Sequence, residues 1–238
     1  MAKYQRVLLK LSGEILKGKS DTNFDEQVLT RLAGEVCKVV ASGTQLFIVV
    51  GAGNIFRHAT HAHEKMERVT ADYMGMLGTL INALALQDAF ERVGVTTRVM
   101  SAIESPRVVE PFIRRRAIRH VEKGRVVILA AGTGNPFFTT DSAAVLRAAE
   151  LKCEVVLKGT KVDGIYDSDP RKNPKAKRYD QLSYQQVVQQ ELAVMDLTAF
   201  TMAQDNGLPI IVFDIITPGN LERIIAGESV GTTVSLGA

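Results

Sequence analysis

Residues 125–158 read RVVILAAGTGNPFFTTDSAAVLRAAELKCEVVLK and hold two apolar runs with a glycine-rich loop and a helical stretch between them. The runs Arg125–Ala130 and Cys153–Lys158 are short and rich in β-branched residues, which is typical of strands buried on both faces of a sheet. Asp141–Leu151 has helical periodicity. A strand, a helix and a strand in this order predict a βαβ unit and hence a parallel sheet.

The same alternation continues on both sides of this unit. Further strands are predicted at Arg6–Leu11, Leu46–Val50, Val95–Ser101, Ile210–Phe213 and Thr232–Ser235, and helices at Asp25–Ala41, Met66–Val93 and Pro111–Lys123. The pattern predicts an α/β fold, a mainly parallel central sheet with helices on both faces. Because no linker or repeat interrupts it, we expect a single domain over residues 1–238, with an N-terminal and a C-terminal lobe. Ligands are expected beyond the carboxyl ends of the strands.

Composition narrows the class of protein. The chain has 238 residues, 46% of them hydrophobic and 23% charged, which is ordinary for a globular protein. A net charge of +3 is too small to predict nucleic-acid binding, but it suits a small polyanionic substrate. Cys37 and Cys153 do not form a disulfide framework, which favours a reducing cytoplasm. The N-terminus lacks the features of a signal peptide, and no run of 18 apolar residues predicts a membrane span.

Two segments at the carboxyl ends of predicted strands suggest contacts to phosphate. Lys10-Leu11-Ser12-Gly13 places an ammonium group beside a glycine turn, where backbone N–H groups can approach an anion. Gly51-Ala52-Gly53-Asn54, with Arg57 after it, suggests a phosphate cradle at a helix start. It matches neither the GxGxxG nor the Walker A pattern. The alternatives are a solvated strand-end lysine in the first case, and a tight turn with a surface arginine in the second.

The loop Gly132–Thr140 carries the strongest signal for a ligand. Its glycines allow close approach, and its threonines and asparagine offer groups that read a base and hold a phosphate. Asp141, which follows, either caps the helix or orients lysines around a transferring phosphate, and the two roles can coexist. Asp72 either accepts hydrogen bonds from both ribose hydroxyls or is a carboxylate near a helix N-terminus, where the helix dipole favours negative charge.

The segment Lys158–Pro170 follows the strand that ends the βαβ unit. Its polar residues and Tyr166 either hold a purine or form a hairpin-like surface loop, with a turn signal at Asp163-Gly164. His58, His61 and His63 lie close together, but no cysteine or further histidine completes a tetrahedral set, so no protein metal site is predicted.

Taken in order, these motifs resemble the bacterial uridylate kinases of the amino-acid kinase superfamily. The resemblance covers essentially the whole chain, through KLSGE, GAGNIFR, DYMGMLGT, GTGNPFFTTDSAA, LKGTKVDGIYDSDP and VMDLTAF. The GTGNPFFTTD segment is specific to this family, whereas KLSG and VDG are shared across the superfamily. The resemblance implies phosphorylation of UMP by ATP in pyrimidine nucleotide biosynthesis, in a homohexamer.

The resemblance also implies roles for individual residues. The catalytic set it implies is Lys10, Arg57, Asp141 and Lys158. The ATP contacts it implies are Lys10, Leu11, Ser12, Gly13, Gly53, Arg57, Thr160, Tyr166 and Asp169. The UMP contacts it implies are Ala52, Asp72, Thr133, Gly134, Asn135, Pro136, Phe137, Phe138, Thr139 and Thr140. Mg²⁺ is expected to arrive with ATP, without a dedicated set of protein ligands.

The resemblance also extends to regulation. Arg98 and Arg125 match basic positions of an effector site, which implies GTP as an activator and UTP as an inhibitor. However, Glu91 stands where some members have histidine, and residues 18–23 are short against the loop linked to GTP activation. The family also often has three glycines where this chain has Gly51-Ala52-Gly53. Alanine is tolerable there if its backbone N–H makes the contact and its φ is negative.

Catalysis in such an enzyme rests on positioning and charge neutralisation, because the acceptor is already an anionic phosphate oxygen. Two rival functions remain. One is a kinase of the same superfamily acting on carbamate or an amino-acid carboxylate, and the other is a nucleotide-binding regulator without turnover. The GTGNPFFTTD loop argues against the first, and the combination of Lys10, Arg57 and Asp141 argues against the second.

Overall fold

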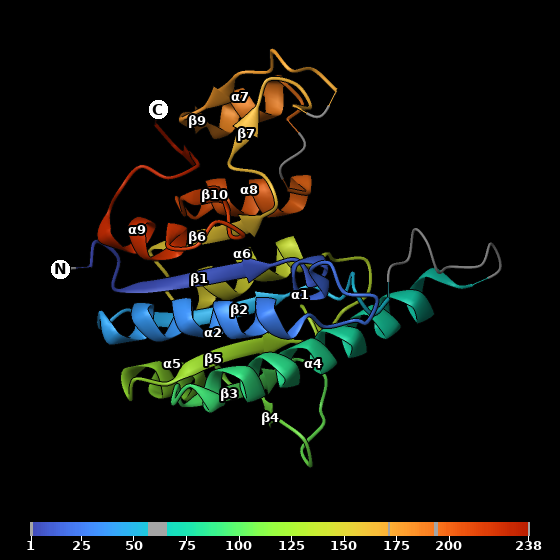
Figure 1. Cartoon of the computed structure of the whole chain (residues 1–238). Helices are drawn as coiled ribbons and strands as arrows, with labels where there is room; N and C mark the ends of the chain where they lie inside the picture. Colours follow the sequence, from blue (N-terminus) through green and yellow to red (C-terminus); the bar gives the residue numbers. More distant parts are fainter. Residues whose placement is uncertain (1, 57–65, 171, 193–194, 238) are drawn as a thin grey trace.

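The computed structural model describes residues 2–56, 66–170, 172–192 and 195–237. Nine strands of the described residues form one sheet in the order β4-β3-β5-β2-β1-β6-β10-β11-β9 (Figure 1). Their bounds are β1 Arg6–Leu11, β2 Gln45–Val50, β3 Thr97–Ser101, β4 Glu110–Pro111, β5 Val126–Ala130, β6 Val155–Thr160, β9 Gln181–Ser183, β10 Ile210–Asp214 and β11 Thr232–Ser235. A separate antiparallel pair joins β7 Ile165–Tyr166 to β8 Arg178–Tyr179.

The sheet is parallel throughout except where β10 meets β11. β1 lies at its centre, between β2 and β6, and five of its six residues are buried. Burial on both faces explains the unbroken apolar runs that mark these strands in the sequence. The prediction of a mainly parallel sheet is therefore confirmed.

Helices cover both faces of the sheet. One apolar core, which includes Leu9, Ile48 and Ile128, packs against α1 Gly13–Lys17, α2 Glu26–Ala41, α4 Arg68–Arg92 and α9 Asn220–Ala226. The other, which includes Leu8 and Phe47, packs against α5 Arg114–Glu122, α6 Thr140–Glu150, α7 Tyr184–Gln189 and α8 Leu197–Asp205. Successive strand residues alternate between these cores, because side chains of a strand point to opposite faces.

The element boundaries differ from the predicted ones in instructive places. The helix predicted from Pro111 begins at Arg114, because Pro111 belongs to the short edge strand β4. The five-residue helix α1, with Ser12 as its N-cap, was not predicted. The helix predicted at Asp25 begins one residue later, since the Asp25 carboxylate caps it by accepting from the backbone N–H groups of Gln27 and Val28.

The longest helix, α4, is long and apolar enough to cross a membrane, judged by length and composition alone. Such a signal is weak, because a core helix of a globular protein satisfies the same criteria. One side of α4 packs into the core through Ala83, Leu86 and Phe90. The opposite side leaves Tyr73, Leu77 and Ile81 between 43% and 50% exposed.

Candidate active site

Two lysines and one aspartate meet at the carboxyl edge of the sheet. Lys10 on β1 and Lys158 on β6 are partners in register, so their side chains leave neighbouring strands at the same level. Asp141 lies in the first turn of α6 and joins them. Its Oδ1 forms an ion pair with Lys10 Nζ at 2.6 Å, and its Oδ2 accepts a hydrogen bond from Lys158 Nζ at 2.7 Å. These three residues are called the charged triad below.

The charged triad is largely buried, which shapes its electrostatics. Burial alone would raise the pKa of the Asp141 carboxyl, but the charges of Lys10 and Lys158 outweigh it and hold that pKa below its ordinary value. Burial lowers the pKa of the Lys158 ammonium, and the charge of Lys10 adds to this effect while Asp141 opposes it. With two cations and one anion, the triad favours an incoming anion such as a phosphate.

The two predicted phosphate segments lie against each other beside the triad. The backbone N–H of Gly51 donates to the carbonyl of Leu11 at 2.9 Å. A Cβ on Gly13 would lie 2.6 Å from the Gly51 carbonyl oxygen and 2.8 Å from the Gly53 nitrogen. Glycine is therefore required at position 13 for this close approach. The Leu11 side chain is buried in the core, so that only its backbone is available to a ligand.

The prediction of a helix start after the Gly51–Asn54 segment falls on residues 57–65, which lie outside the described residues. Gly53 to Ile55 form a turn, and no helix begins between Gly51 and Phe56. Backbone N–H groups of Ile55 and Phe56 donate to the Ala52 carbonyl, which closes the turn. Arg57, the predicted catalytic arginine, and the three neighbouring histidines lie outside the described residues.

A cavity of about 180 Å³ lies between α4 and the loop that follows β5. Most of the predicted UMP contacts come together in its lining, namely Ala52, Asp72, Thr133, Asn135, Phe138, Thr139 and Thr140. Gly134, Pro136 and Phe137 belong to the same loop but not to that lining. Gly132 and Gly134 have φ values of 58° and 82°, which only glycine adopts at little cost.

Asp72 ties this loop to α4. Both of its oxygens accept from Arg68 Nε at 3.0 Å, and Oδ2 also accepts from the backbone N–H of Phe137 at 2.8 Å. The Arg68 guanidinium lies over the Phe137 ring, 5.7 Å from its centroid. A carboxylate has about four acceptor sites, so Asp72 keeps capacity for another donor at the cavity wall.

The prediction that Asp141 caps its helix is wrong. Thr139 is the N-cap of α6, where its Oγ1 accepts from the backbone N–H groups of Asp141 and Ser142. The same hydroxyl donates to the Asp196 carboxylate, which also accepts from Ser142 Oγ at 2.8 Å. Because Thr139 supplies the cap, the Asp141 carboxylate is left to the two lysines.

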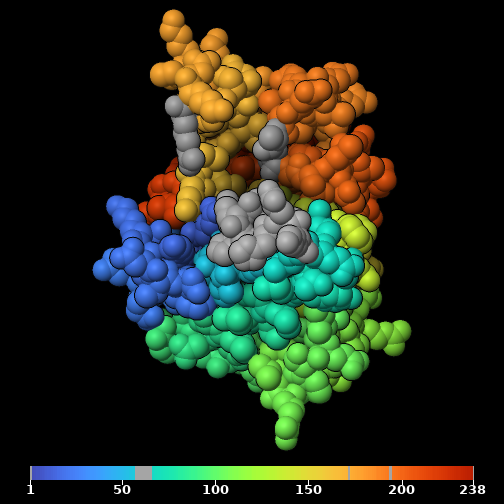
Figure 2. Space-filling model, turned by 90° about the vertical axis from the view of Figure 1, so that its right-hand side faces the viewer, coloured from blue at the N-terminus to red at the C-terminus, as the bar shows by residue number. Residues whose placement is uncertain are grey.

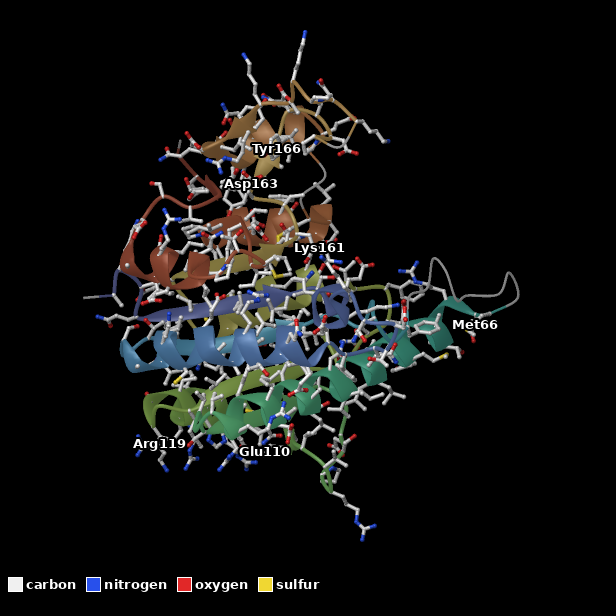
Figure 3. All side chains as sticks on the ribbon, viewed as in Figure 1. Met66, Glu110, Arg119, Lys161, Asp163 and Tyr166 are labelled. Carbon is white, nitrogen blue, oxygen red and sulfur yellow. The ribbon has the colours of Figure 1, made fainter. Side chains whose placement is uncertain are left out.

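A second cavity, of about 590 Å³, reaches the end of β6 at Thr160, which follows Lys158 by two residues. Three of the ATP contacts implied by the family resemblance, Thr160, Tyr166 and Asp169, line it. The Tyr166 hydroxyl donates to Asp163 Oδ1 at 2.6 Å, and this bond raises the pKa of Tyr166. Figure 3 labels both residues in the upper part of the molecule. Figure 2 faces this edge of the molecule and shows the segment of β7 and α7, in orange, standing above the N-terminal half.

Sequence reasoning missed two parts of this region. Gln190, Glu191 and Leu192, directly after α7, line the second cavity. Glu191 has a φ of 50°, but neither the residue type nor its neighbours signals this conformation. Asp196 was quoted only within the family motif VMDLTAF. Its position before an apolar helical stretch is an N-cap signal that could have directed attention to it.

The predicted effector residues lie away from the triad across the sheet, Arg98 second in β3 and Arg125 directly before β5, and β2 separates these two strands from β1. Arg98 pairs with Glu91 at 3.8 Å and with Glu110 at 3.9 Å. Arg125 lies 3.0 Å from His120 Nδ1, and His120 Nε2 lies 3.2 Å from Glu110. A cavity of about 420 Å³ is lined by Arg98, Glu110 and others. Glu110 on the edge strand β4 lies far across the sheet from Lys161, the residue after β6 (Figure 3).

A mainly parallel α/β sheet with a largely buried lysine–aspartate–lysine triad at the carboxyl ends of its strands suits an enzyme that transfers phosphate. The chain belongs to the amino acid kinase family, whose model matches residues 5–214.

Solved structures narrow the likeness further. The chain resembles the UMP kinase of Bacillus anthracis with 41% identity and a TM-score of 0.96, over 99% of this chain and 97% of that one. The UMP kinase of Ureaplasma parvum matches with 37% identity and a TM-score of 0.92, over 98% and 99%. The uridylate kinase of Archaeoglobus fulgidus matches with 29% identity and a TM-score of 0.75, over 99% and 100%.

Proposed function

We propose that the protein is a UMP kinase, which converts ATP and UMP into ADP and UDP by direct in-line transfer. The observation that carries this proposal is the charged triad, whose Asp141 follows Thr140 of the smaller cavity and whose Lys158 lies two residues before Thr160 of the larger one. The smaller cavity is lined by most of the predicted UMP contacts, and the larger one by three of the predicted ATP contacts, Thr160, Tyr166 and Asp169. The likeness to two UMP kinases over nearly the full chain supports the same acceptor.

The reaction requires no protein nucleophile. An oxygen of the UMP phosphate attacks the γ-phosphorus of ATP, and the bond from that phosphorus to the bridging oxygen of ADP breaks. Negative charge accumulates on the transferring group and on the leaving ADP, where Lys10 and Lys158 neutralise it. Asp141 holds both ammonium groups in place, so the cations need no rearrangement when the phosphates arrive.

We propose that Mg²⁺ enters on the phosphates of ATP. In the triad each Asp141 oxygen is already engaged by a lysine, so this carboxylate holds ammonium groups rather than a metal. Mg²⁺ is usually held by substrate phosphates and water with few protein ligands, and it would add positive charge to the transferring group. Among the described residues no group of three or more His, Cys, Asp or Glu is placed to hold a metal.

The two substrates are assigned to the two cavities by size and lining. UMP occupies the smaller one, where Asp72 has acceptor sites left for the ribose hydroxyls and the Thr133–Thr140 loop surrounds the base and phosphate. ATP occupies the larger one, with its phosphates running along Lys10–Gly13 and Gly53. The chain then acts as one domain, with its N-terminal lobe on the UMP side and its C-terminal lobe on the ATP side.

The assembly, location, pathway and effectors of the protein are proposed as well. We propose a cytoplasmic homohexamer that serves pyrimidine nucleotide biosynthesis, and the exposed apolar side of α4 supports assembly. GTP as activator and UTP as inhibitor would act near Arg98 and Arg125, whose surroundings include a cavity of about 420 Å³. Arg57 remains the proposed third cation on the transferring phosphate.

One assay separates this function from its rivals. Purified protein with ATP and Mg²⁺ is offered UMP, CMP, dUMP, AMP, carbamate and aspartate in turn, and ADP release is followed. We expect release with UMP and much less with the others. Absence of ADP with UMP would refute the proposal, and equal rates with UMP and CMP would refute specificity for uracil. Faster turnover of dUMP than of UMP would contradict the role of Asp72 at the ribose.

A further inference from the structure

The side of α4 that faces the sheet carries two polar residues that the mechanism above does not use. Asn82 is completely buried and Thr79 is 2% exposed. Buried polar groups cost free energy unless they are hydrogen-bonded. The hydrogen-bond partners of Asn82 and Thr79 therefore indicate the structural role of these two side chains. Apart from the Met76 carbonyl on α4 itself, those partners lie on the two loops that line the candidate active site.

Asn82 holds the Gly51–Asn54 loop. Its Nδ2 donates to the Gly51 carbonyl at 2.7 Å and to Asn54 Oδ1 at 2.7 Å. Asn54 Nδ2 donates in return to Asn82 Oδ1 at 3.0 Å and to the Asn23 carbonyl at 2.8 Å. Because backbone carbonyls only accept, both amide orientations are fixed, and all four amide N–H groups are used.

Thr79 holds the other loop one turn earlier on the same helix. Its Oγ1 accepts from the backbone N–H of Ala131 at 2.8 Å and donates to the Met76 carbonyl at 2.7 Å. Ala131 opens the loop that runs to Thr140, and its φ is 61°. A residue with a side chain adopts this left-handed conformation at a cost, so a fixed partner for its N–H helps to set where the loop begins.

Close packing leaves α4 little freedom relative to these loops. A Cβ on Gly78 would lie 2.9 Å from the Ala52 Cβ, so the helix backbone packs directly on the Gly51–Asn54 loop. Gly13 in turn packs on the same loop, where its Cβ would lie 2.4 Å from Asn54 Oδ1. The amide pair therefore lies beneath the point where the proposed phosphate segments meet.

We propose that Asn82 and Thr79 are positioning residues for phosphoryl transfer, Asn82 for the Gly51–Asn54 loop and Thr79 for the Ala131–Thr140 loop. This inference rests on the proposed function. The two residues act on different loops, so their removal changes different kinetic constants, whereas a purely stabilising role would lower stability and leave the constants alone.

The test uses steady-state kinetics of the full chain. Thr79→Val preserves shape and removes the hydroxyl, so KM for UMP should rise on the order of 10-fold while KM for ATP stays within twofold. Asn82→Ala frees the loop beside both phosphates, so kcat should fall on the order of 10²-fold. Thr79→Ser restores the hydroxyl and should restore KM for UMP.

Thr97→Val is the matched control. Thr97 is equally buried, but its hydroxyl donates only to the Val95 carbonyl at the amino end of β3. The Thr97→Val variant should have a lower thermal unfolding temperature than the wild type, while kcat and both KM values stay unchanged. If Asn82→Ala fails to fold, the KM values of Thr79→Val and Thr79→Ser for UMP still test whether α4 positions the Ala131–Thr140 loop.

Failure of the proposed function and failure of the positioning role give different results. Wild-type protein that releases no ADP with UMP would refute the proposed function, and this inference with it. Active wild-type protein whose Thr79→Val and Asn82→Ala variants keep kcat and both KM values within twofold would overturn this inference alone.

Discussion

Lys158 is a buried ammonium group that must stay protonated to neutralise phosphate. Burial lowers its pKa from the ordinary value of 10.5, and neighbouring Lys10 adds to the effect. Raising the pH therefore removes its charge earlier than it would for a lysine in water. We expect kcat/KM for ATP, which reports groups of the free enzyme, to fall on the alkaline side at a pH below 10.5.

The variant Lys158→Arg tests the origin of this fall, because arginine keeps its charge at all accessible pH values. Its alkaline limb should lie at higher pH than that of the wild type, whatever its absolute rate. A limb at the same pH in both proteins would show that another group, such as the substrate base, controls the fall.

Lys10 supplies the second cation of the triad. Lys10→Ala should lower kcat by roughly 10² or more, the scale seen when one preorganised stabiliser of transition-state charge is removed. Lys38→Ala is a suitable control, because Lys38 forms an exposed ion pair with Glu222 far from the site. The kcat values of the wild type, Lys10→Ala and Lys38→Ala are compared by measuring ADP release at saturating substrate concentrations. Near-full kcat in a folded Lys10→Ala protein would contradict the assignment.

Single residues differ in how far the sequence could predict their roles. Lys10 and Lys158 stand out because each is a charged residue directly after an apolar run, Val7–Leu9 and Val155–Leu157. Their joint contact with Asp141 could not be read from the sequence, since it depends on how α6 lies across β1 and β6. The alternative prediction, that Asp141 caps α6, failed for a local reason, because Thr139 two residues earlier is the N-cap of this helix. Arg57 stays a prediction.

At the scale of elements, α1 and the Gly51–Asn54 turn touch through Gly13. Gly13→Ala would place a Cβ 2.6 Å from a backbone oxygen and 2.8 Å from a backbone nitrogen, so the two phosphate segments must separate. We expect a large loss of kcat together with a stability loss of about 1–3 kcal/mol, as for other overpacked sites. Kinetics and denaturant unfolding measure the two effects.

Gly34→Ala is the matched substitution in a helix with free space. No atom lies within 4 Å of a Cβ built there, and its φ is not in the left-handed range. Alanine should stabilise α2 by about 0.5–1 kcal/mol, because it restricts the unfolded chain, with kcat unchanged. If Gly13→Ala behaved like Gly34→Ala, the contact between the two phosphate segments would not matter for catalysis.

Most long elements could be predicted because their burial leaves a periodic signature. The strand Arg6–Leu11 and the helix after Asp25 are examples. The short elements could not. α1 has five residues and β4 has two, and their existence depends on capping and edge pairing rather than on periodicity. The start of α5 was misplaced because Pro111, a common first residue of helices, serves at a sheet edge here.

At the scale of the molecule, α4 has two sides with different roles. Its inner side anchors both substrate loops, and its outer side exposes Tyr73, Leu77 and Ile81 as one apolar strip with helical spacing. If this strip is buried between subunits, Leu77→Asp should reduce the molar mass in solution. Light scattering after size exclusion measures it, with Leu236→Asp, which changes another exposed leucine, as control. A monomeric wild type would contradict the proposed assembly.

The overall topology followed from the alternation of strands and helices, and the family likeness followed from motifs at the strand ends. What topology cannot supply is the identity of the acceptor, because the same sheet and triad would serve a carboxylate or a carbamate as well as a phosphate. The acceptor assignment therefore rests on the Gly132–Thr140 loop and on the likeness to UMP kinases.

The most direct test follows the transferred phosphate itself. Protein, Mg²⁺, UMP and ATP labelled at the γ-phosphate are incubated, and the products are separated by chromatography. The proposed function predicts that the label appears in UDP at the same rate as ADP is formed, and that omission of UMP abolishes ADP formation. Label recovered as inorganic phosphate, or no transfer to UMP by folded protein, would contradict it.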